Sequence, residues 1–151
     1  MFRTKPHIPV YKRNMRVRFF CVLLLILTGC LGSKPAVEDL SGKEDLSIFK
    51  LQFVRGTRDG DRLSTEALIS DSSSNLTVDM HFTVGSPTRL DTGVWHWVRN
   101  NENATGQITA RSVTFLGGQD GPPSIGGSFD LMNPDGLAVY RVNIPVTVLK
   151  R

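Results

Sequence analysis

The sequence predicts an all-β domain, and two observations support this fold class. Apolar and polar residues alternate with a period of two along several segments, which is the spacing that places one face of a strand on a core and the other in water. The segments between these runs are short and rich in Gly, Pro, Asn, Asp and Ser, which is turn chemistry. We therefore expect strands joined by short loops, with no long amphipathic helix.

The clearest strand is expected over residues 76–84, where apolar residues alternate with Thr, Asp and His. Further alternating runs begin at Phe49 and at Tyr140, and weaker strands are expected at 63–70, 94–99, 107–116 and 125–132. Seven strands with short connections indicate an antiparallel β-sandwich, with a flattened meander β-barrel as the alternative.

Two features near the carboxyl end refine this prediction. Asn133-Pro134-Asp135-Gly136 combines a Pro that presets φ with a Gly that accepts a left-handed conformation, which predicts a hairpin between the last two strands. Pro145 lacks an N–H and interrupts the last run. That strand is therefore expected to lie at a sheet edge or to be bulged at Pro145.

The first thirty residues have a different composition. A start with six Lys or Arg residues and no acid precedes nine apolar residues from Phe19 to Leu27. A membrane-spanning helix needs about 20 apolar residues, so this run is too short to be a permanent span and is typical of a signal segment. Small residues and a cysteine follow in the sequence Leu27-Thr28-Gly29-Cys30.

Leu27-Thr28-Gly29-Cys30 resembles the lipobox of bacterial lipoproteins at all four positions. The resemblance implies cleavage between Gly29 and Cys30 and attachment of lipid to the Cys30 sulfur. Leu31, in place of an Asp after the cysteine, implies the outer membrane, with the protein facing the periplasm. The expected organisation is a signal peptide over 1–29, a lipidated cysteine and flexible tether over 30–47, and a β-sandwich domain over 48–151. The alternative to a flexible tether is an ordered first strand or short helix, since Ala36 to Leu40 could make one helical turn. Met15 is an alternative start to Met1, since Arg16 and Arg18 would then form the basic region.

Removal of the signal changes the charge of the chain. Six of the 18 Lys and Arg residues and none of the 14 Asp and Glu residues precede Cys30. The mature chain therefore has 12 basic and 14 acidic residues and a net charge of −2. A nucleic-acid partner is not expected without a basic stripe. Cys21 would be removed and Cys30 acylated, so the mature domain has no cysteine for a disulfide.

Residues that carry chemistry are few. Asp79 and His81 share one face of an expected strand, and His96 is the other histidine of the mature chain. A closed zinc site requires four ligands, so these residues do not predict one. The chain has no Gly-x-Ser-x-Gly nucleophile elbow. We expect no catalytic residues, no metal site and no cofactor.

One group of residues has the pattern of a binding surface. Trp95, Trp97 and Arg99 are two apart on an expected strand and share a face. Exposed, the two indoles would form a stacking platform for a sugar ring or an apolar partner. The alternative is that both fill the core, which the more polar His96 on the opposite face favours.

These patterns favour two classes of function over a third class. The first is a non-catalytic interaction or accessory domain, anchored to the membrane through Cys30, with an envelope protein or a glycan as partner. The second is a binding module for a glycan or a small apolar ligand that uses the Trp pair or a barrel interior. An enzyme is the third.

Overall fold

A computed structural model describes residues 34–117 and 122–150, and its compact unit begins at Lys34. The described part is all-β, as the alternation predicts, and contains eight strands. Their bounds are β1 Val37–Asp39, β2 Lys50–Asp59, β3 Arg62–Ser70, β4 Ser74–Thr83, β5 Arg89–Arg99, β6 Glu102–Leu116, β7 Ser124–Met132 and β8 Ala138–Val148.

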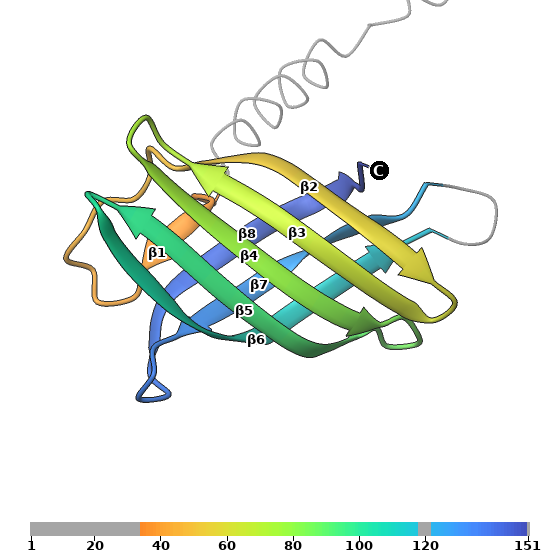
Figure 1. Cartoon of the computed structure of the whole chain (residues 1–151). Coiled ribbons are helices and arrows are strands. Elements are labelled where there is room, and N and C mark those ends of the chain that lie inside the picture. Colours follow the sequence, from red (N-terminus) through yellow and green to blue (C-terminus); the bar gives the residue numbers. More distant parts are fainter. Residues whose placement is uncertain (1–33, 118–121, 151) are drawn as a thin grey trace, which may run out of the picture. The chain divides into compact units, whose positions relative to one another are not determined.

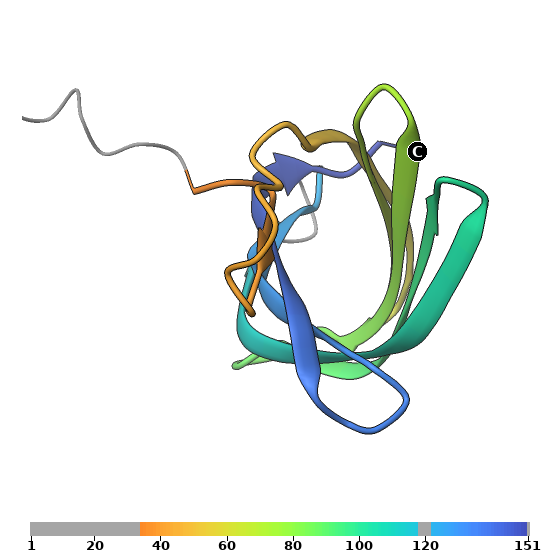
Figure 2. The ribbon, with the colours of Figure 1, turned by 90° about the vertical axis from the view of Figure 1, so that its left-hand side faces the viewer.

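The strands form one antiparallel sheet in the order β1-β8-β7-β6-β5-β4-β3-β2 (Figure 1). From β2 to β8 each strand therefore pairs with the next one in the sequence, as in a meander. The view along the sheet shows that it curls round on itself (Figure 2). The two sides approach where the chain after β8 meets β2: Lys150 N donates to Val54 O at 3.1 Å, and Gly56 N donates to Lys150 O at 3.2 Å.

This architecture corrects two expectations. All seven expected strands are present, but β1 is an eighth, and the strands form one curled sheet, a half-barrel, instead of the two stacked sheets of a sandwich. The reason lies in β6, which is 15 residues long. Its first part pairs with β5 and its second part with β7, so one strand carries the sheet continuously around the turn.

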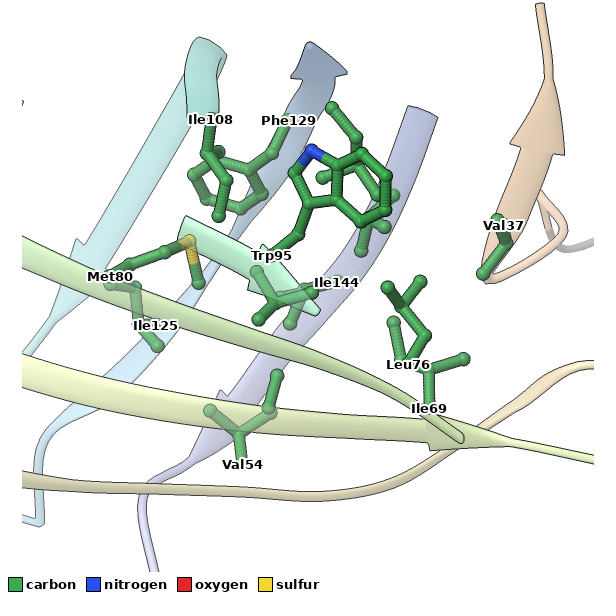
Figure 3. Close-up of a cluster of buried hydrophobic side chains, with 14 of the residues drawn as sticks. Val37, Val54, Ile69, Leu76, Met80, Trp95, Ile108, Ile125, Phe129 and Ile144 are labelled. Atoms are coloured by element: carbon green, nitrogen blue, oxygen red, sulfur yellow. The ribbon is translucent and has the colours of Figure 1, made fainter. Parts of the chain in front are cut away.

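Side chains on the concave face fill the interior. The strand over 76–84 shows the predicted alternation, since Val78, Met80 and Phe82 are all at most 1% exposed. Phe82 meets Phe129 of β7 edge to face, with ring centroids 6.2 Å apart. Figure 3 shows side chains from strands on both sides of the curl pointing toward one another, with Trp95 among them. Burial of this apolar surface is the main force that holds the sheet curled.

The two predictions near the carboxyl end are confirmed. The Asn133–Gly136 turn joins β7 to β8, with Gly136 N donating to Asn133 O at 2.9 Å and Gly136 at φ +76°. At Pro145 the register of β8 against β7 shifts by one residue, between the pairs Ile125↔Thr147 and Gly127↔Ile144. The bulge accommodates a residue that cannot donate to the ladder.

Part of the expected tether is ordered. Val37, which is 1% exposed, pairs with Val142 of β8, and the short strand β1 ends at Asp39. Leu46 and Phe49, between β1 and β2, are also buried. This is the ordered first strand that was the alternative to a flexible tether. The segment has no alternating pattern that would favour it, because a strand of three residues is stabilised by β8, more than 100 residues away, and by burial of Val37.

Candidate functional site

The mouth end of the curled sheet is the end at which the β3–β4, β5–β6 and β7–β8 connections lie. Trp97 and Arg99 lie near this end of β5, and Tyr140 lies at the start of β8. The loop between β1 and β2 brings Glu44 to the same end, where it contacts Arg99. Residues from three distant parts of the sequence therefore meet here.

The alternation places Trp95 and Trp97 on the concave side of the sheet. Trp95 is 3% exposed and Trp97 is 4% exposed, so neither indole forms an open stacking platform. Val94, His96 and Val98 face outward, as in the core arrangement that the polar His96 favours. Arg99 is on the same face as the indoles but reaches the mouth, where it is partly exposed.

The two indoles differ in their hydrogen bonding. Trp95 Nε1 donates to Met132 O at 2.9 Å. Trp97 Nε1 is buried, and the described residues provide no acceptor within hydrogen-bond distance of it. A buried donor without an acceptor is uncommon in folded proteins and is costly. Trp97 is therefore the side chain of this region whose polar atom is least well satisfied.

Trp97 also lines a pocket at the mouth end, which we call the mouth pocket. Its volume is about 410 Å³, within the range of small-ligand sites. Beside Trp97 it is lined by Tyr140 and by the Arg99–Glu44 ion pair. The remaining lining residues belong to the β5–β6 hairpin and are Asn100, Glu102, Asn103 and Ala104.

Aromatic rings form the inner part of this pocket. The Trp97 ring lies 4.8 Å from the Tyr140 ring, and Phe49 meets Trp97 edge to face at 5.3 Å, measured between centroids. Burial raises the pKa of the Tyr140 phenol, and the negative charges of Glu44 and Asp39 add to this effect. Tyr140 therefore stays a neutral hydroxyl that can donate and accept hydrogen bonds over the physiological range.

An ion pair forms the outer part of the pocket. The Arg99 guanidinium donates to the Glu44 carboxylate, which raises the pKa of Arg99 further above its ordinary value. The guanidinium also lies 5.9 Å from the centroid of the Trp97 ring. Both charged side chains are about 40% exposed, at 40% for Arg99 and 43% for Glu44. Exposed pairs of this kind contribute little to stability, so separating Arg99 from Glu44 costs little.

Glu44 is placed by a compact turn that begins at Asp39. The Asp39 carboxylate accepts hydrogen bonds from Ser41 Oγ at 2.7 Å and from the backbone N of Ser41, Lys43 and Glu44, each at 2.9 Å. These bonds, with that from the Ser41 hydroxyl the largest contribution, lower the pKa of Asp39 to about 2. An ionised Asp39 thus fixes the backbone on which Glu44 sits.

The outer face of β3 and β4 carries the other polar group that the sequence singles out. Ser64 Oγ lies 2.9 Å from His81 Nδ1, across the two strands. Burial raises the pKa of Asp79, and the charge of Glu66 adds to this. Within the described residues no hydrogen bond joins Asp79 to His81, so the acid does not orient the imidazole as it does in a Ser-His-Asp triad.

His96 does not join this group. His96 is exposed on β5 and lies opposite Thr77 of β4. Thr77 is two positions before Asp79 on β4. In the part of the chain that the structure covers, no three His, Cys, Asp or Glu side chains gather in a way that could hold a metal ion.

Sequence reasoning found Trp97 and Arg99 but missed their partners. Glu44 lies 55 residues before Arg99, in a segment expected to be a tether, and no local pattern marks it. The lipidation and cleavage residues, Cys30 and Gly29, lie outside the described residues.

Comparisons of this chain with protein-family models, with curated proteins and with solved structures return no match.

Proposed function

We propose that this chain is a lipid-anchored protein of a bacterial cell envelope, and that its β-domain is a non-catalytic binding module. The anchor is the acylated Cys30, the membrane is the outer membrane, and the domain faces the periplasm. The binding site is the mouth pocket between Trp97, Tyr140 and the Arg99–Glu44 pair.

The anchor is supported by the amino-terminal sequence. The basic, acid-free start, the nine apolar residues and the Leu27–Cys30 motif occur in the order that lipoprotein export requires. Among residues 34–117 and 122–150, no helix has the length and hydropathy needed to cross a membrane.

The observation that carries the binding role is the mouth pocket. It combines a buried indole whose donor lacks an acceptor among the described residues with groups at the surface that can donate and accept. Binding sites commonly place a few polar groups over apolar and aromatic walls. The Ser64–His81 pair lines a separate hollow of about 340 Å³ on the outer face, but no described Phe, Tyr or Trp ring lines that hollow and no described hydrogen bond joins Asp79 to His81. We therefore assign the pair no catalytic role.

A glycan is the ligand class that fits this pocket best. Carboxylate, guanidinium, amide and phenol groups together match the donors and acceptors of sugar hydroxyls, and Tyr140 offers an aromatic ring. The other option, an apolar ligand inside a barrel, is less well supported. We take the curled sheet to be a flattened meander barrel, and its described interior is filled by apolar side chains.

Mass spectrometry of the amino-terminal peptide tests the anchor. We expect a mature chain that begins at an acylated Cys30, and we expect Cys30→Ser to abolish the modification. Cys21→Ser is the matched control, because Cys21 lies in the apolar run and would be removed. An unmodified wild-type chain that begins at Met1 or Met15 would overturn the proposed anchor.

The two indole N–H resonances test the binding site, since the chain has only two tryptophans. Titration with soluble oligosaccharide fragments of the envelope should shift the Trp97 Nε1–H signal. The Trp95 signal should stay in place because its N–H is bonded to Met132 O inside the sheet. Arg99→Ala should abolish the shift, whereas Arg111→Ala, on β6, should not. Absence of any shift with glycans would exclude this ligand class.

A further inference from the structure

The covalent distance between the proposed anchor and the folded domain is short. Asn143 of β8 binds the incoming chain, with its N donating to Ala36 O at 2.9 Å and its Nδ2 donating to Pro35 O at 3.1 Å. The chain is therefore attached to β8 from Pro35 onward. Five residue steps separate Cys30 from Pro35, which span at most about 18 Å when fully extended.

Such a tether keeps the domain close to the lipid. The headgroup region on each side of a bilayer is about 5–8 Å thick. An acylated Cys30 at the base of that region leaves Pro35 no more than about 13 Å above the headgroup surface. The part of the domain near Asn143 must then lie within about 13 Å of the headgroup surface.

The strand register shows which end of the sheet is nearest to the tether. β1 is antiparallel to β8, with Val37 opposite Val142 and Asp39 opposite Tyr140. The residues that precede Val37 therefore enter from the side of the carboxyl-terminal half of β8. β6 and β8 both end on that side, away from the mouth end (Figure 1).

The outer face at that end carries an apolar group of side chains, which we call the β6–β8 patch. Val146 is 49% exposed, Val148 53% and Leu116 55%. Leu116 is paired with Ser124, which is paired with Val148. Cross-strand partners share a face, so Leu116 and Val148 lie in one row on the convex side of the sheet. Exposed apolar groups of this kind mark contact surfaces.

Basic residues flank this patch along the chain. Lys34 directly precedes Pro35, and Lys150 is two residues after Val148; both are exposed. Lysines beside exposed aliphatic side chains suit the phosphate groups of a lipid surface.

We propose that the β6–β8 patch rests on the membrane that holds the Cys30 lipid. This rests on the proposed lipid anchor and adds the orientation of the domain. Tyr140 lies eight residues before Val148 on β8, which corresponds to about 26 Å along the strand. The mouth pocket therefore opens away from the lipid, where a periplasmic ligand can reach it.

Site-directed labelling of the lipidated protein tests this orientation. After loss of Cys21 and acylation of Cys30, an introduced cysteine is the only free thiol of the mature chain. A nitroxide is attached in Val148→Cys, in Leu116→Cys as a second position, and in Val98→Cys as the control. Val98 is also an exposed valine on the convex face, at 39%, but lies on β5.

Each labelled protein is compared in detergent and in vesicles of phosphatidylethanolamine and phosphatidylglycerol. We expect labels at 148 and 116 to lose most of their access to a water-soluble relaxation reagent in vesicles, while the label at 98 keeps it. Equal access at all three positions on protein that floats with the vesicles would overturn the orientation and leave the anchor intact.

Two other outcomes would also overturn the proposal. If the protein does not float with the vesicles, the anchor fails and the orientation fails with it. If the labels at 148 and 116 are protected in the unlipidated Cys30→Ser protein without vesicles, and this protection increases with protein concentration, the patch binds a second copy of the chain.

Discussion

Trp95 and Trp97 are buried two residues apart on one face of β5, yet only Trp95 has an acceptor for its indole N–H among the described residues. Trp95 Nε1 bonds to Met132 O and so links β5 to the end of β7 across β6. A buried donor without an acceptor among the described residues lowers stability, and Trp97 places this donor in the wall of the mouth pocket. This position supports the binding role that we propose.

The two tryptophans should respond differently to the same substitution. Trp95→Phe removes a hydrogen bond and leaves Met132 O without its donor, whereas Trp97→Phe removes a donor that has no described acceptor. We expect Trp95→Phe to lower the free energy of unfolding by about 1 kcal/mol more than Trp97→Phe. Denaturant titration of both variants measures the difference. Equal losses would mean that the Trp97 N–H has a partner after all.

Gly106 is needed because of the same hydrogen bond. A Cβ at this position would lie 1.9 Å from Met132 O and 2.7 Å from Trp95 Nε1. Gly106→Ala must therefore push β6 away from the end of β7, and we expect a loss of about 3 kcal/mol or failure to fold. Gly85→Ala is the control, since its Cβ would meet nothing closer than 3.5 Å. Thermal melts compare the two, and a stable Gly106→Ala protein would contradict the close approach.

The interior of the curled sheet gives a third prediction. Phe82 is 1% exposed and contacts Phe129, so Phe82→Ala should cost about 3–5 kcal/mol through lost burial and a cavity. Thr77, on the convex face of the same strand, should cost less than about 1 kcal/mol when changed to Ala. Denaturant titrations report both values. Similar losses at the two positions would show that β4 does not bury one face.

The Asp39 turn makes a prediction about pH. The pKa of Asp39 is lowered to about 2 in the folded chain, below the ordinary value of about 3.9. Its ionised form therefore stabilises the turn at pH values above the ordinary pKa, and this stabilisation is lost as the pH falls through about 2.

Carbon NMR of the Asp39 carboxyl group measures this titration directly. We expect a midpoint near 2 in the wild type and a higher midpoint in Ser41→Ala, because the Ser41 hydroxyl makes the largest contribution to the lowered pKa. A wild-type midpoint at the ordinary value would show that the turn does not hold Glu44 as described.

The strands could be predicted because each of them has one face exposed to solvent. In β4, Val78, Met80 and Phe82 alternate with exposed or partly exposed residues, and the period of two is visible in the sequence. The same alternation placed Trp95, Trp97 and Arg99 on one face. It identifies which side chains are buried but not what they are buried against, so it could not distinguish two stacked sheets from one curled sheet.

The remaining features depend on contacts between distant residues. β1 exists because Val37 packs beside Val142, and the mouth pocket exists because Glu44 reaches Arg99. Neither Val37 nor Glu44 is in a segment with a periodic pattern. The orientation that we propose depends on Asn143, which donates hydrogen bonds to Pro35 and Ala36. Pro35 and Asn143 are 108 residues apart in the sequence.

The pairing of β1 with β8 has a consequence for the export that we propose. A chain that crosses a membrane from its amino end delivers β1 first and β8 last, and a hairpin meander can form piece by piece in between. The site for Val37 on β8 and the Lys150 contacts with β2 arrive only after β2 to β7 have been delivered. In the export that we propose, the domain therefore cannot complete its fold while β8 and Lys150 are still in the translocation channel.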